Sequence, residues 1–277
     1  MTLCGILRFR VEVSLWGLGS YRQCGDCASG QRRNENFKLN GNMNYRAIIF
    51  VIFCTFATTL NAQTEYPTES ENDLFWQPSI QIKFSHFQEK SDTACIRYYE
   101  KYGSQMSSNI GFRDVVDIPK SHLSKKIKKR TGFDKSYLAP VFCKNCSCIL
   151  SEDTLELKVH QLLFDVAEMC ARGARRELSE MQSEMNINNV NTMFFTTVKN
   201  SWEEKMIGTF GSILRDVLIQ KKDGAYAEWR KLVDELLEKN ERFATQSEDI
   251  YRFILGEPLE KDYVKAKWIT GDLRNRN

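Results

Sequence analysis

The sequence predicts a mainly α fold, namely a disulfide-stabilised bundle of about five to six helices with an irregular cysteine loop. Apolar residues recur every three or four positions through most of the second half of the 277-residue chain. Residues that cap helix ends precede several of these stretches. Five cysteines follow an apolar leader, and an oxidising compartment would convert such cysteines to disulfide bonds.

The first expected elements are short. Residues 63–90 are acidic at their start and should form a loose N-terminal arm, in which residues 79–87 alternate like a short strand or an extended segment. Asp92 is placed to cap a helix that Gly103 would end. One interpretation of residues 119–132 adds another short helix.

A long amphipathic helix is the strongest structural prediction. Asp153 and Glu156 have the spacing of a helix cap, and the apolar positions that follow continue to Met185 at helical spacing. Gly173 would bend or break this helix. The Asn-rich segment 186–191 should turn the chain.

Three further helices are expected after this turn. Capping-box spacings at Ser201 and Thr245 mark two of the starts, and the third helix begins near Tyr226. Gly208 and Gly211 lie inside the first of these helices, at a cost of about 1 kcal/mol each relative to Ala. Their presence indicates close approach of a neighbouring helix.

An apolar run at residues 47–60, preceded by Arg46 and followed by Ala62, is typical of a secretory signal peptide with its start at Met43. The run is shorter than the roughly 20 apolar residues that span a bilayer. We therefore expect cleavage near Ala62 rather than retention as a signal anchor. The protein is predicted to be secreted and extracellular.

The leader also defines the domain organisation. Cys24 and Cys27 form a lone C-x-x-C pair before it, to which we assign no redox or zinc role. The predicted parts are a non-structural upstream extension at 1–42, a signal peptide at 43–62, the loose acidic arm at 63–90 and a single helical domain at 91–277.

The charge balance excludes one class of partner. The chain has a net charge of +3, but residues 1–62 contain seven Lys and Arg against three Asp and Glu, which leaves a net charge of −1 on residues 63–277. Nucleic-acid binding needs a concentrated basic face that neutralises phosphates. We therefore predict no nucleic-acid partner.

The cysteines after the leader predict disulfide bonds without fixing their pairing. Four of the five can pair, and the fifth is either free or bridges to another chain in a disulfide-linked dimer. Three of them crowd into one loop, which could tie down the helices on either side. The candidates are Cys95, Cys143, Cys146, Cys148 and Cys170.

The cysteine loop permits two other interpretations. With His160 it offers four ligands to zinc, but the spacing fits no standard structural zinc site and secretion favours disulfides, so we predict no metal and no cofactor. Asn145 begins an N-x-S sequon in the same loop, the only one in residues 63–277. Glycosylation at Asn145 would place this loop at the surface.

A run of cations has three competing interpretations. It is a solvated helix capped by Ser121 with Leu123 and Ile127 facing inward, or a patch for an acidic glycan or an anionic membrane. The third interpretation is a multibasic processing site, Lys128, Lys129 and Arg130, at which cleavage releases residues 131–277. The cations are Lys125, Lys126, Lys128, Lys129 and Arg130.

Catalytic motifs are lacking from the sequence. It contains no G-x-S-x-G, H-E-x-x-H, P-loop or G-x-G-x-x-G pattern. His86, His122 and His160 are isolated from any matching nucleophile. Glu168 or Glu177 could join another acid as a hydrolase pair, but exposed acids at such spacings are common on helices.

The predicted function is therefore binding. We expect a secreted helical binding protein, non-catalytic, whose ligand is another protein or an apolar small molecule held between helices. The alternative is a secreted signalling precursor cleaved after Arg130. A secreted hydrolase is the further alternative.

Overall fold

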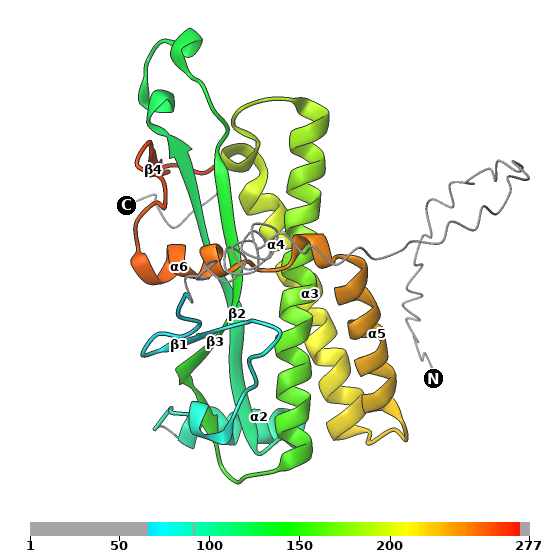
Figure 1. Ribbon diagram of the computed structural model, residues 1–277. Helices are drawn as coiled ribbons and strands as arrows, with labels where there is room; N and C mark the ends of the chain where they lie inside the picture. The colour runs from blue at the N-terminus through cyan, green and yellow to red at the C-terminus, as the bar shows by residue number, and fades with distance from the viewer. Residues whose placement is uncertain (1–65, 91, 272–277) are drawn as a thin grey trace, which may run out of the picture. The chain divides into compact units, whose positions relative to one another are not determined.

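The computed structural model describes residues 66–90 and 92–271, which belong to the unit Gln63–Asn277. These residues form five α-helices and a four-stranded antiparallel sheet, so the expected mainly α bundle is wrong and the fold is mixed α and β (Figure 1). The upstream extension and the signal peptide, 1–42 and 43–62, lie outside the described residues. The helices are α2 (Asp92–Tyr102), α3 (Thr154–Met185), α4 (Val190–Leu214), α5 (Ala225–Lys239) and α6 (Ser247–Leu255). The strands are β1 (Asp73–Phe75), β2 (Met106–Pro119), β3 (Lys135–Ile149) and β4 (Tyr263–Lys265).

The sheet is built on one long hairpin. Its strand order is β1-β3-β2-β4, and β2 pairs with β3 in a register that includes Ile110 opposite Phe142 and Asp117 opposite Lys135. Side chains alternate along β3, so that Leu138 faces one core cluster while Ala139 faces another. Because both faces are covered, apolar residues follow one another without the polar alternation of a half-buried strand. The sequence pattern therefore did not reveal these strands.

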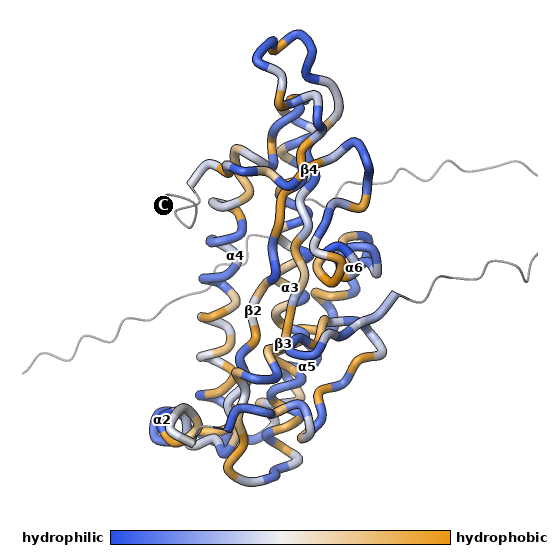
Figure 2. Tube along the Cα trace, turned by 90° about the vertical axis from the view of Figure 1, so that its left-hand side faces the viewer, coloured by the Kyte–Doolittle hydropathy of each residue, from blue (hydrophilic) through white to orange (hydrophobic). Residues whose placement is uncertain are grey.

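Helices cover both faces of this sheet. On one face, Leu138 and Val116 pack with residues of α3 and α4 around Phe195. On the other face, Ala139 packs with Ile250 of α6. Figure 2 shows hydrophobic positions along the sheet strands and along α3, where these elements face one another.

The contact between α3 and α4 depends on one glycine. A Cβ atom at Gly173 would lie 2.4 Å from the Trp202 ring, so only glycine lets this indole lie against α3. α3 runs unbroken through Gly173, and the break considered there does not occur. The close approach expected at Gly208 and Gly211 is also wrong, because a Cβ at either position would meet nothing within 4 Å.

The segment expected to be a loose arm is part of the fold. β1 pairs with β3, and the strand is followed by a buried indole, Trp76. Ile82 and Phe87 are also buried, in a cluster with Phe142 and Phe164. Of the two alternatives for residues 79–87, the short strand is not formed, and the segment instead packs on α3 and β3, as the alternative of a piece packed on helices predicts.

Helix starts were predicted with mixed success. The Asp153 side chain caps α3 by accepting a hydrogen bond from the Glu156 amide at 2.8 Å, as predicted. The start predicted at Ser201 is wrong, since α4 passes through this position without interruption. α6 is capped at Gln246 rather than at Thr245, whose side chain has another partner.

Among the described residues, no helix combines the length and the apolar character that a membrane crossing requires.

Candidate functional site

The structure assigns the cysteines to two disulfide bonds and one thiol. Cys95 of α2 is bonded to Cys148 of β3, and Cys143 is bonded to Cys146 within β3. Cys170 is free and lies in α3 with 1% of its surface exposed. Burial raises the pKa of its thiol to about 12. A disulfide-linked dimer through Cys170 would therefore require the helices to separate.

The Cys143–Cys146 disulfide closes a bulge in the sheet. Between Ser107 and Asn109 of β2 the register shifts, and the opposing residues of β3 leave the ladder. Ser147 supports the bulge by donating to the Cys143 carbonyl at 2.6 Å and by accepting from the Asn109 amide at 2.9 Å.

This bulge contains the sequon at Asn145 and the cysteines that were considered as zinc ligands. The side chain of Asn145 is at the surface and hydrogen-bonds to Asn72. The cysteines of the loop are in disulfides, and both ring nitrogens of His160 have hydrogen-bond partners. The zinc interpretation would therefore require these bonds to be broken.

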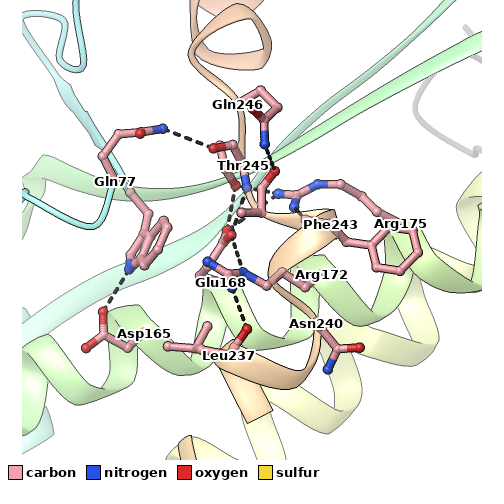
Figure 3. Close-up of polar contacts among 12 residues, drawn as sticks. Gln77, Asp165, Glu168, Arg172, Arg175, Leu237, Asn240, Phe243, Thr245 and Gln246 are labelled. Atoms are coloured by element: carbon pink, nitrogen blue, oxygen red, sulfur yellow. Dashed lines mark hydrogen bonds and ion pairs between the residues drawn. The ribbon is translucent and has the colours of Figure 1, made fainter. Parts of the chain in front are cut away.

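A buried ionic network surrounds Glu168 (Figure 3). One carboxylate oxygen accepts from Arg172 Nε and from the Thr245 amide, each at 2.8 Å. The other accepts from the Thr245 hydroxyl at 2.5 Å and from Arg175 at 3.5 Å. Arg172 also donates to the Leu237 carbonyl at 2.6 Å, and Arg175 donates to the Leu138 carbonyl at 2.9 Å.

The geometry of this network gives it a structural role. The Glu168 side chain is fully buried and both of its oxygens are occupied, so it has neither access to a substrate nor a vacant position for a proton. Its donors come from α3 and from the segment between α5 and α6, so the network ties that segment to α3 and, through Arg175, to β3. Glu177 is likewise engaged, by Trp202 Nε1 at 2.8 Å.

Ser108 and His160 have the spacing of a nucleophile and its base. Ser108 Oγ lies 2.7 Å from His160 Nδ1, and His160 Nε2 lies 3.1 Å from the Met106 carbonyl. Since a carbonyl only accepts, Nε2 carries the proton and Nδ1 accepts from Ser108. Burial lowers the pKa of His160 to about 4, against a smaller opposing effect of the Met106 carbonyl. A base of this pKa with no carboxylate partner is poorly suited to deprotonate serine at neutral pH.

The space between the helices is filled by side chains. Residues of α3, α4 and α5, among them Leu163, Ile213 and Val233, form one packed cluster. An open depression of about 540 Å³ lies beside it, lined by Leu155, Leu218 and other residues of mixed polarity. The geometry thus favours neither the apolar ligand site nor a catalytic cleft.

The strongest candidate for function lies in the connection between β2 and β3, residues 120–134. We call its residues 120–133, which precede buried Asp134, the basic tip. It extends past the ends of the neighbouring helices at the top of Figure 1. Most hairpin loops have about 2–5 residues, and loops much longer than that are often functional. The tip contains only two short 3-10 turns, Lys120–Leu123 and Ile127–Lys129. The expected helix is therefore reduced to these turns.

Cations dominate the surface of the basic tip. The carboxylates next to the tip differ in access: Asp134 is buried and accepts from the Thr192 amide at 2.6 Å, and exposed Glu260 pairs with Lys135. Asp262, whose carbonyl accepts from the Lys120 amide at 2.7 Å, is exposed beside the base of the tip. Residues 120–133 contain no acid. The exposed cations are Lys120, Lys125, Lys126, Lys128, Lys129 and Arg130.

Large apolar side chains lie among these cations. Ile127 is 77% exposed, Leu123 is 60% exposed and Phe133 is 44% exposed. The inward orientation expected for Leu123 and Ile127 is therefore wrong, because among residues 66–90 and 92–271 neither side chain packs into a core cluster. Figure 2 shows the tip as mainly hydrophilic with isolated hydrophobic positions.

The base of the tip is anchored by β4. Pro119 pairs with Tyr263, whose hydroxyl donates to the Phe133 carbonyl at 3.0 Å. The chain beyond β4 adds an exposed cation, Lys267, and an indole, Trp268, which is 72% exposed. Cationic and apolar side chains therefore occur together in the segment that follows β4 as well.

Comparison with protein-family models, with curated proteins and with solved structures finds no match to this chain. The function must therefore be inferred from the residues of the site alone.

The sequence predicted the cations of the tip but not its geometry. Lys125 to Arg130 were recognised as a candidate patch and processing site. The outward positions of Leu123 and Ile127 were missed, although two apolar residues isolated among cations in a segment without acids could have indicated them.

Proposed function

We propose that the protein is a secreted, non-catalytic binding protein that docks on an anionic lipid surface through the basic tip. The observation that carries this proposal is the presence of exposed cations and exposed Leu123 and Ile127 in one projecting loop. The two disulfides support an oxidising compartment, as does the expected leader.

The apolar residues favour lipid over an acidic glycan. Both ligands would attract the cations, and each Lys or Arg near an anionic membrane contributes about 1 kcal/mol. Only the membrane offers an apolar phase to Leu123 and Ile127, since a glycan would leave both in water. Complete burial of such a side chain contributes about 1.5–3 kcal/mol, so partial insertion of the two should add about 2 kcal/mol.

A vesicle-binding experiment tests the proposal. Wild-type protein should co-sediment with phosphatidylcholine vesicles that contain phosphatidylserine and not with pure phosphatidylcholine, and added salt should weaken the binding. Leu123→Ser with Ile127→Ser should weaken it about 30-fold, as expected for a loss of about 2 kcal/mol. Ile207→Ser on α4, where the side chain is 61% exposed, is the matched control and should bind like wild type.

Heparin binding distinguishes the glycan. If wild type binds heparin but not the anionic vesicles, the lipid proposal is wrong and the glycan interpretation replaces it. If the Leu123→Ser, Ile127→Ser protein binds vesicles as tightly as wild type, the insertion argument is wrong. Neutralising the cations from Lys125 to Arg130 to glutamine should abolish vesicle binding.

A further inference from the structure

The basic tip also has the geometry of a protease substrate. Residues 125–133 are all exposed, and they include the multibasic sequence Lys128, Lys129, Arg130. Arg130 has an extended backbone, with φ −80° and ψ 114°, whereas Lys128 and Lys129 lie in the exposed 3-10 turn Ile127–Lys129, which must open before a protease can bind all three as a strand. Extended segments fit the strand-like binding mode in which many protein clefts take up peptides.

The contacts that hold the Arg130–Thr131 bond lie at the surface of the tip, and they include the hydrogen bond from the Arg130 amide to the Ile127 carbonyl at 2.9 Å. The Ser121 hydroxyl donates to the Thr131 carbonyl at 2.7 Å and accepts from the Thr131 amide at 3.1 Å. Arg130 Nε donates to the Ser124 carbonyl at 3.2 Å. All these contacts are exposed, so local opening of the tip should require little free energy.

The chain on the two sides of this bond is joined elsewhere. β2 lies before the bond and β3 after it, and they pair along their length up to Asp117 and Lys135. The Cys95–Cys148 disulfide links α2, before the bond, to β3. A buried ion pair joins Asp117 to Arg252, with Nε–Oδ2 at 2.6 Å.

We propose that Arg130–Thr131 is a processing site for a serine protease specific for multibasic sequences, and that cleavage gives a two-chain molecule rather than a released fragment. In the reaction, water adds across the peptide bond, so that Arg130 gains a carboxylate and Thr131 gains a free amine. Residues 131–277 then stay attached through Cys95–Cys148 and through the β2–β3 ladder. This inference does not depend on lipid binding, and it differs from the release of residues 131–277 that the multibasic interpretation of the sequence predicts.

Digestion of the folded protein with a convertase of the serine protease class that cleaves after paired basic residues tests both parts of the proposal. Intact mass spectrometry should show one gain of water. A non-reducing denaturing gel should show a single species of the original size, and a reducing gel should show two, one of them beginning at Thr131. Native size exclusion should show no change in elution volume.

Variants assign these results to particular residues. Arg130→Gln should block cleavage. Ser121→Ala should accelerate cleavage several-fold because both hydrogen bonds between Ser121 and Thr131 are lost. In a Cys95→Ser, Cys148→Ser protein the nicked chains should separate on a non-reducing denaturing gel. If that variant does not fold, nicked wild type is reduced instead, and its two chains should then separate on a denaturing gel.

Two results would overturn the proposal. If the convertase leaves folded wild type uncut, or cuts it equally well after Arg130→Gln, this bond is not the processing site. If nicked wild type yields free 131–277 on a non-reducing gel, the two-chain product is wrong.

Discussion

Mild acid should destabilise the protein through His160. In the folded state burial lowers the pKa of this imidazole to about 4, and in the unfolded chain it returns to its ordinary value of 6.5. The unfolded state therefore binds the proton first as the pH falls. Stability should be lost progressively between about pH 6.5 and pH 4 and should not change further, from this group, below that range.

The size of the effect follows from the difference between the two pKa values. Each pKa unit corresponds to about 1.4 kcal/mol, so the full loss below pH 4 is about 3 kcal/mol and the loss between pH 7 and pH 5 is about 2 kcal/mol. Phe87 and Tyr98 lie beside the imidazole, with ring centroids at 5.9 and 6.4 Å. Neither hydrogen bond of the ring is to a carboxylate, so the Met106 carbonyl offsets only a part of the cost of charging it.

The variant His160→Gln shows how much of the stability lost at low pH depends on His160. Glutamine can accept from Ser108 and donate to the Met106 carbonyl without titrating. Urea unfolding at pH 7 and pH 5 should show that wild type loses about 2 kcal/mol more than the variant. His86, whose pKa is also lowered by burial, titrates in both proteins and cancels. Equal losses in wild type and variant would refute the assignment of a neutral, buried His160.

Two further predictions concern packing and buried charge. Gly173→Ala should cost about 1–3 kcal/mol of unfolding free energy because the new methyl group meets Trp202, whereas Gly208→Ala should be neutral or stabilising by up to about 1 kcal/mol. Similar urea midpoints for these two alanine variants would contradict the packing argument. Arg252→Met should cost about 3–5 kcal/mol because it leaves the Asp117 carboxylate buried without its partner. Adding Asp117→Leu should recover most of that loss, and a single-variant loss below about 1 kcal/mol would count against the buried pair.

The sequence predicted what depends on neighbouring residues. The cap at Asp153 and the helix end at Gly103, which has φ +67°, follow from local hydrogen bonding and backbone freedom. Thr245 shows the limit of such reasoning. It has the spacing of a helix cap, but its hydroxyl donates to Glu168, which is far away in the sequence.

The sheet could not be predicted because its signal is non-local. Val115, Val116 and Asp117 of β2 are all buried, so the strand lacks the alternation by which half-buried strands are recognised. The buried acid is explained only by Arg252, which arrives from α6. At the candidate site the charge of the tip was predictable from composition, whereas the exposure of Leu123 and Ile127 depends on the path of the loop past the ends of the neighbouring helices.

The free thiol of Cys170 offers a use beyond architecture. It is the one unpaired cysteine among the described residues, and it is enclosed between α3 and its neighbours. A thiol reagent can reach it only when the helical layer opens, so in protein beginning at Gln63 the labelling rate would report how often this layer opens. The chain thus contains a natural chemical probe of local unfolding, and no engineered label is needed.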